Sequence, residues 1–184
     1  MSRALATVGR WRVANLAVVV VALGIAWLLK AFYSRAGFDE LRWILDPTVR
    51  LVEVAGAGPF ELEAQHGYLC RAHRFEVVPA CAGVNFLIAA FVTLCLGVVS
   101  ACTRARHRVG LLLGAALAAY ATTLLANATR IVWAMRLHEA GASFGPLTPE
   151  RLHRALGVGV YFAFLAALFT LASRVAGADR EAAS

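Results

Sequence analysis

The amino-acid sequence predicts an all-α polytopic membrane protein with about four transmembrane helices and a small extracytoplasmic cap made of a helix and a hairpin. Of its 184 residues, 60% are hydrophobic, and the mean hydropathy is +0.69. Both values are well above those of a typical soluble domain. The apolar residues gather in four blocks without a charged side chain, each close to the roughly 20 residues that cross a hydrocarbon core as a helix. The helices of a soluble bundle would instead each carry a polar face.

We expect a single membrane domain over residues 1–184, with transmembrane helices at about 13–30, 81–102, 109–135 and 151–173. The first block could be a cleaved signal peptide, because arginines precede it. However, Lys30 follows the block at once and no small-x-small cleavage pattern lies at its end, so an uncleaved anchor is favoured. Four glycines are expected to allow close packing of the third and fourth helices: Gly110, Gly114, Gly157 and Gly159.

The segment 38–78, between the first two transmembrane helices, is expected to form the cap. Asp46-Pro47 is typical of a helix cap followed by the first helical residue, and Gly56 and Gly58 would end that helix.

The rest of the cap has the pattern of a hairpin. Residues 60–65 alternate between apolar and polar, His66-Gly67 can turn, and residues 68–78 can return as a second strand. We expect the helix and the hairpin to lie on the membrane above the ends of the transmembrane helices.

The basic residues beside the apolar blocks predict both termini on the cytoplasmic side. Arg104, Arg106 and Arg108 crowd the short turn between the second and third helices, and short basic loops stay in the cytoplasm. The chain is thus expected to be a multi-pass protein of the cytoplasmic, or inner, membrane with the cap outside. Membrane flanks account for the net charge of +7 and the pI near 9.9. The lipid bilayer, and no nucleic acid, is therefore the expected partner.

Three polar residues form the candidate catalytic site. Cys81 lies in PACAG at the start of the second helix, Arg130 in NATRI at the end of the third, and His153 in RLHRAL at the start of the fourth. Polar groups at membrane depth are costly, so those that occur are functional candidates. Because successive helices alternate in direction, all three residues are expected at the outer membrane face.

Each residue suits one part of acyl transfer through a thioester. If Pro79 is the first helical residue, Cys81 lies in the first helical turn, where free amides favour a thiolate nucleophile. Arg130 stays cationic and could stabilise both that thiolate and an oxyanion. His153 titrates near neutrality and could act as general acid and base. Such chemistry needs no metal and no cofactor.

The segment PACAGVNFLIAAF, the motif NATRI and the later His153 together resemble the Cys, Arg and His signatures of the exosortase and archaeosortase family of membrane cysteine proteases or transpeptidases. The resemblance covers roughly residues 77–171. It implies that membrane-tethered exported proteins are cleaved at a PEP-CTERM-like C-terminal sorting tail, with water or an amine as the acceptor. Many members have eight or so membrane helices, so this chain with about four would be a compact member, resembling the short exosortase K type.

Asn127 is the fourth candidate and the predicted substrate-binding residue. It lies three residues before Arg130 and therefore shares its helix face. Its amide could orient the guanidinium or hold a substrate amide, but an interhelical hydrogen bond is an equal alternative.

Other interpretations stay open at this point. Cys70 could form a disulfide with Cys81, which would indicate a thiol-redox membrane protein, although no CxxC pair is present. A small membrane transporter would also place polar side chains in a cavity. His138 could replace His153 as the base, and H-x3-C-x2-H, formed by His66, Cys70 and His73, could ligate zinc but supplies only three ligands. We expect Cys95 and Cys102 to serve in packing.

Overall fold

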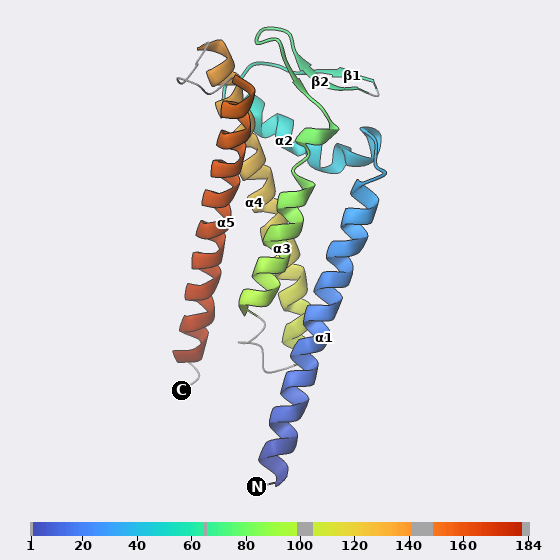
Figure 1. Cartoon of the computed structure of the whole chain (residues 1–184), viewed down its shortest axis with the longest axis vertical. Coiled ribbons are helices and arrows are strands. Elements are labelled where there is room, and N and C mark those ends of the chain that lie inside the picture. The colour runs from blue at the N-terminus through green and yellow to red at the C-terminus, as the bar shows by residue number, and fades with distance from the viewer. Residues whose placement is uncertain (1, 65, 99–104, 141–148, 182–184) are drawn as a thin grey trace.

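The computed structural model describes residues 2–64, 66–98, 105–140 and 149–181. Four long helices run side by side, with both termini at one end and the small elements at the other (Figure 1). These helices are α1 (Ser2–Tyr33), α3 (Val84–Val98), α4 (Ala105–Glu139) and α5 (Pro149–Glu181). The chain therefore passes back and forth along the long axis of the molecule.

Each long helix belongs to a stretch that is long and apolar enough to cross a membrane. The stretches are Asn15–Tyr33, Pro79–Gly97, Arg108–Glu139 and Arg154–Arg174. Large apolar side chains point outward along them, since Trp27, Leu117 and Phe162 are each about 70% exposed. Surfaces of this kind are covered by lipid in a membrane protein. The predicted fold class, an all-α polytopic membrane protein, is confirmed.

Helix α3 lies at the centre and packs against α1, α4 and α5. Its inward residues are buried: Phe86, Leu87, Ala90, Phe91 and Leu94. Helix α5, in contrast, is the least buried of the four spans. The core therefore follows α3, and α5 contacts it from one side.

The cap helix begins earlier than predicted. A 3₁₀ turn, η1 (Asp39–Leu41), leads into α2 (Arg42–Val54), so Pro47 lies inside the helix and not at its start. Proline has no N–H, so the carbonyl of Trp43, four residues earlier, has no helical donor. The hydroxyl of Tyr120 on α4 donates to this carbonyl at 2.6 Å, and the two rings stack with centroids 5.7 Å apart. The interior proline is thus compensated by a neighbouring helix.

The cap helix ends as predicted, at a glycine. Gly56 has φ +80°, and the N–H groups of Gly56 and Ala57 donate to the carbonyls of Glu53 and Val52. This is the Schellman arrangement, in which a left-handed glycine satisfies the last free carbonyls of a helix. Buried residues on one face hold α2 in the core: Ile44, Leu45, Val49 and Val52.

The predicted hairpin is a three-stranded antiparallel sheet. Its strands β1 (Glu61–Glu63), β2 (Gly67–Cys70) and β3 (Phe75–Val77) pair in the order β1-β2-β3. The expected second strand over residues 68–78 was wrong, because the chain turns between β2 and β3 and Arg74 there has φ +50°. Gly67 is the first residue of β2 and not part of a turn. The backbone of Val77 lies so close to it that a side chain at this position would clash.

The sheet is anchored to α2 through Tyr68. This side chain is buried, packs edge-on against Phe38 with ring centroids 5.5 Å apart, and donates its hydroxyl proton to Asp46. Burial, and then the hydrogen bond to Asp46, raise the pKa of Tyr68 above its ordinary value, so the phenol stays protonated and keeps donating.

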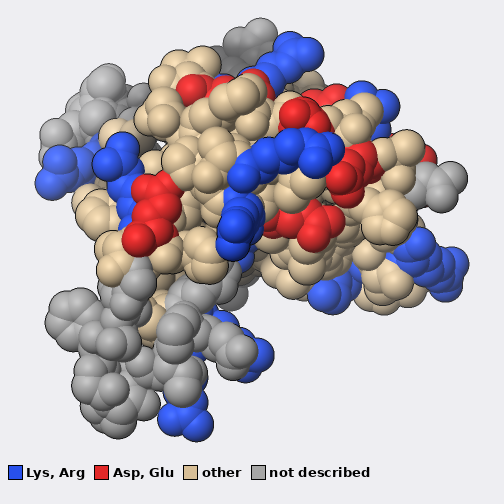
Figure 2. All heavy atoms as spheres, turned by 90° about the horizontal axis from the view of Figure 1, so that it is seen from above, with Lys and Arg blue, Asp and Glu red and all other residues tan. Residues whose placement is uncertain are grey.

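Acidic and basic side chains are interspersed over the end of the molecule that carries the cap (Figure 2). They include the ion pairs of Arg42 with Asp46 and of Arg71 with Glu61. Such a surface faces water. The molecule therefore has an apolar shaft and a charged cap.

Candidate functional site

Cys81 lies in a short turn immediately before α3. It ends η2 (Pro79–Cys81), a single 3₁₀ turn, and Gly83 with φ +71° separates it from the first residue of α3, Val84. Pro79 is thus the first residue of a helical turn that contains Cys81, as expected, but this turn is a separate 3₁₀ turn and not the first turn of α3. A positive φ at Gly83 redirects the backbone, so α3 starts with a new set of hydrogen bonds, the first running from Phe86 N to Gly83 O.

Asn127 joins this turn to two helices. It is fully buried on α4, its Nδ2 donates to the Cys81 carbonyl at 2.5 Å, and its Oδ1 accepts from the Tyr161 hydroxyl at 3.0 Å. Of the roles open to Asn127, the structure contains the interhelical hydrogen bond. Both ends of the amide are thus engaged within the protein. The contact of Asn127 with a substrate stays a prediction.

Arg130 lies one turn further along α4 and packs on α5. Its Cζ is 5.5 Å from the centroid of the Tyr161 ring, a cation–π arrangement. Its Cδ would lie 3.3 Å from a Cβ added at Gly157, so the missing side chain there makes room for the arginine. The Nε of Arg130 is buried and has no hydrogen-bond partner among the described residues.

The packing role predicted for the four glycines holds only in part. It is confirmed for Gly157, which contacts Arg130. It was wrong for Gly110, Gly114 and Gly159, because no described atom lies within 4 Å of a side chain added at these positions. Glycine is frequent in membrane helices, so its presence alone does not identify a contact.

Tyr161 is the central residue that sequence reasoning missed. Its hydroxyl donates to Asn127, and its ring lies beside the Arg130 guanidinium. Its ring stacks on Phe86 of α3 with centroids 4.8 Å apart. The available signal was its position eight residues after His153, which puts both on one face of the fourth span. We refer to Cys81, Asn127, Arg130 and Tyr161 as the Cys81 site.

His153 belongs to α5, but its side chain lies outside those that the structure describes. The backbone places residue 153 four positions before Gly157 and eight before Tyr161, hence on the helix face that meets Arg130. The alternative base, His138, is exposed near the end of α4.

A second cation approaches the site from α1. Lys30 Nζ donates to Asn85 Oδ1 at 2.8 Å and lies 5.5 Å from the centroid of the Tyr33 ring. Asn85 lies four residues after Cys81, in the first turn of α3. Sequence reasoning had treated Lys30 only as the end of an anchor, yet all four long helices contribute to this region.

Cys70, Cys95, His66 and His73 do not belong to the Cys81 site. Cys70, Cys81 and Cys95 are free, and the buried Cys70 thiol donates to the Ala57 carbonyl at 3.7 Å. The disulfide between Cys70 and Cys81, which was an alternative interpretation of the sequence, is therefore not formed. Cys95 is buried, as expected of a packing residue, while Cys102 lies outside the described residues.

The two imidazoles of the H-x3-C-x2-H motif have separate partners. A ring nitrogen of His66 contacts the Ala64 carbonyl, and His73 pairs with Glu139 of α4. Within the described ranges, no group of three His, Cys, Asp or Glu residues is arranged to hold a metal ion.

No family model, no curated protein and no solved structure matches this chain.

Proposed function

We propose that this protein is a membrane-embedded cysteine peptidase or transpeptidase. Its substrates would be exported, membrane-tethered proteins with a C-terminal sorting tail of the PEP-CTERM kind, cleaved at the outer face of the cytoplasmic membrane. One observation carries the proposal: Asn127 holds the backbone of Cys81 and the hydroxyl of Tyr161 at the same time. The thiol, the arginine helix and the helix of His153 thus meet at one end of the bundle, as the resemblance to exosortases implies.

The roles follow from the chemistry of the side chains. The Cys81 thiolate attacks the scissile carbonyl, and the Arg130 guanidinium stabilises the oxyanion. His153 accepts the thiol proton and delivers it to the leaving amine as the thioester forms. Water or an acceptor amine then releases the acyl group and restores the thiol. The Nε of Arg130 supports this, because it is a buried donor that has no hydrogen-bond partner among the described residues.

Access to Cys81 would be lateral, from the membrane. Helix α3 lies between α1 and α5 (Figure 1), and its exposed positions Asn85, Ala89 and Leu96 follow one helical stripe toward Cys81. A single transmembrane helix of the substrate could lie along this stripe. Its polar segment would then reach the thiol at the membrane surface.

A processing assay in cells tests the proposal. A tail-anchored reporter with a candidate sorting tail is co-expressed with the wild type, Cys81→Ala, Arg130→Ala or His153→Ala, and tail release is followed on gels. Loss of an entire nucleophile or oxyanion donor costs 10²-fold or more in such enzymes, so only the wild type should process detectably.

Cys95→Ala is the matched control, because Cys95 is a buried thiol on α3 that does not belong to the Cys81 site. This variant should process like the wild type. Processing that persists in Cys81→Ala would rule out Cys81 as the nucleophile. If the reporter stays uncleaved with the wild type and with every variant, and Cys81 does not react with maleimide, the transporter alternative is favoured.

A further inference from the structure

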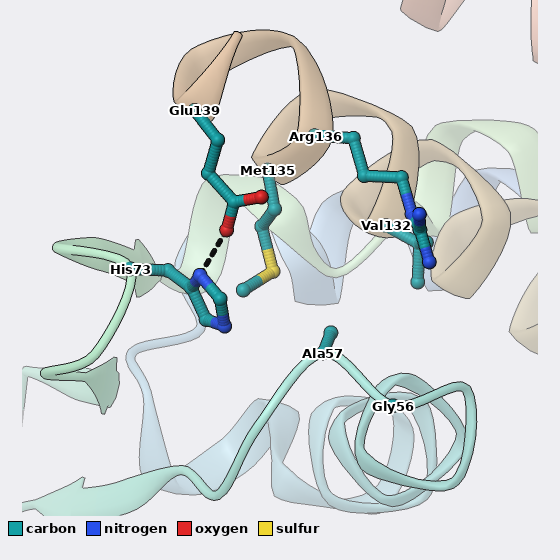
Figure 3. Close-up of a pocket in the computed structure, with 7 residues that line it drawn as sticks. All are labelled: Gly56, Ala57, His73, Val132, Met135, Arg136 and Glu139. Atoms are coloured by element: carbon teal, nitrogen blue, oxygen red, sulfur yellow. Dashed lines mark ion pairs between the residues drawn. The ribbon is translucent and has the colours of Figure 1, made fainter.

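A pocket of about 230 Å³ lies between the cap and the last turns of α4, and we call it the cap pocket (Figure 3). Its walls come from α4, from the turn after α2 and from the turn between β2 and β3. They include Ala57, His73, Met135, Arg136 and Glu139. No residue of the Cys81 site lines it, so it is a separate feature of the molecule.

The cap pocket holds two opposite charges that face the same space. Arg136 is exposed, and its guanidinium makes no hydrogen bond or ion pair with a side chain in the described part of the chain. Glu139 is fixed by an ion pair between its Oε1 and Nδ1 of His73. Figure 3 shows Arg136 and Glu139 on opposite sides of the Met135 side chain. The pocket thus offers a free cation and a carboxylate held in place.

The fold keeps this space open. Gly56, at the left-handed end of α2, has no described atom within 4 Å of where a side chain would begin. The His73 ring is in turn held against Gly58, where an added Cβ would lie 3.3 Å from Nε2. Gly56, which the Schellman turn requires, therefore also leaves room in the pocket, while Gly58 leaves room for the His73 ring that forms part of the wall.

We propose that the cap pocket binds a small zwitterion, namely an α-amino acid with an apolar side chain. The ligand carboxylate pairs with Arg136, whose planar fork matches a carboxylate, and the ligand ammonium group pairs with Glu139. A simple anion would be repelled by Glu139 and a simple amine by Arg136, so both ligand charges are needed. The volume is below the roughly 300 Å³ of the smallest sites for drug-sized ligands, and Ala57 and Met135 provide an apolar wall.

Three related compounds test this on the full chain in lipid nanodiscs. L-valine carries both charges, isovalerate lacks the amine and isobutylamine lacks the carboxylate. Binding is measured by titration calorimetry, with empty nanodiscs as the blank. Because a hydrogen bond to a charged group contributes about a factor of ten in affinity or more, L-valine should bind at least about tenfold more tightly than either analogue.

Two variants locate the binding. Arg136→Gln should bind L-valine no more tightly than isobutylamine. Arg50→Gln is the matched control, since Arg50 is an exposed arginine of α2 that does not line the pocket, and it should bind L-valine as the wild type does. If the wild type binds the three compounds with equal affinity, the proposal is wrong. This test does not depend on whether Arg136→Gln folds. An equal loss in Arg50→Gln would overturn it as well. Neither outcome bears on cleavage at Cys81, because no processing is measured.

Discussion

At the scale of single residues, Gly83 decides how the Cys81 turn meets the helices. Its φ of +71° is rarely adopted by residues with a side chain. A Cβ there would also lie 3.2 Å from the Tyr161 hydroxyl and 3.3 Å from the Asn127 amide carbon. The same position is thus restricted by its backbone and by the two side chains that hold the Cys81 site together.

Gly83→Ala is therefore expected to lower stability and to disturb the site. The left-handed backbone alone costs about 1–2 kcal/mol for alanine, and the contact with Tyr161 and Asn127 adds to it. The midpoint of thermal unfolding in detergent should fall. Gly110→Ala is the control, because a side chain there meets no described atom and the helical φ is ordinary. That variant should keep or raise its stability by up to about 1 kcal/mol, and an equal loss in both would contradict the assignment.

At the scale of elements, Pro47 connects α2 to α4. The proline leaves the Trp43 carbonyl without its helical donor, and Tyr120 of α4 supplies one. The hydrogen bond from the Tyr120 hydroxyl to the Trp43 carbonyl therefore joins the two helices. The pairing fixes the cap helix on the bundle at the level of Tyr120.

A double-mutant cycle tests this dependence. Tyr120→Phe should cost about 1 kcal/mol in the wild type, because the Trp43 carbonyl loses its donor. In a Pro47→Ala background the alanine N–H can bond that carbonyl, so Tyr120→Phe should cost clearly less. Unfolding in mixed micelles with increasing SDS gives the four free energies. If Tyr120→Phe costs the same in both backgrounds, the proline does not create the need for the hydroxyl.

The contact between Tyr120 and Trp43 is an example of what the sequence could not predict. The long helices follow from block length and hydropathy, which are local properties. The start of α2 does not, because the proline inside the helix is compensated by Tyr120, which lies 77 residues after the Trp43 carbonyl that it bonds. Cys81, Arg130 and Asn127 stand out as polar groups in apolar surroundings, whereas the only sequence signal for Tyr161 is its spacing from His153, and its hydrogen bond to Asn127 depends on how the helices pack. The break between β2 and β3 rests on the backbone of Arg74, which composition does not reveal.

At the scale of the whole molecule, the charged cap lies at one end and both termini at the other (Figure 1). In the basic segment between the second and third spans, Arg106 and Arg108 lie in the first turn of α4 and not, as expected, in a turn between the helices, while Arg104 lies outside the described residues. With the basic segment in the cytoplasm, the cap is expected outside.

Accessibility measurements check this orientation. In a chain whose native cysteines are replaced by alanine, Glu63→Cys on the exposed strand β1 should react with an impermeant maleimide on intact cells. Protease-sensitive tags at both termini should be protected there and cleaved in inverted vesicles. A tag cleaved on the side where Glu63→Cys reacts would contradict the arrangement of the spans.

The position of Tyr161 on the fourth span has a consequence for biosynthesis. The Cys81 turn and Asn127, which bonds its carbonyl, are made and inserted before α5. The Tyr161 ring beside Arg130 and the Gly157 backbone that makes room for it belong to α5 and are added later. The surroundings of the thiol and the guanidinium are therefore completed in two steps, first when α4 packs on α3 and then when the fourth span docks.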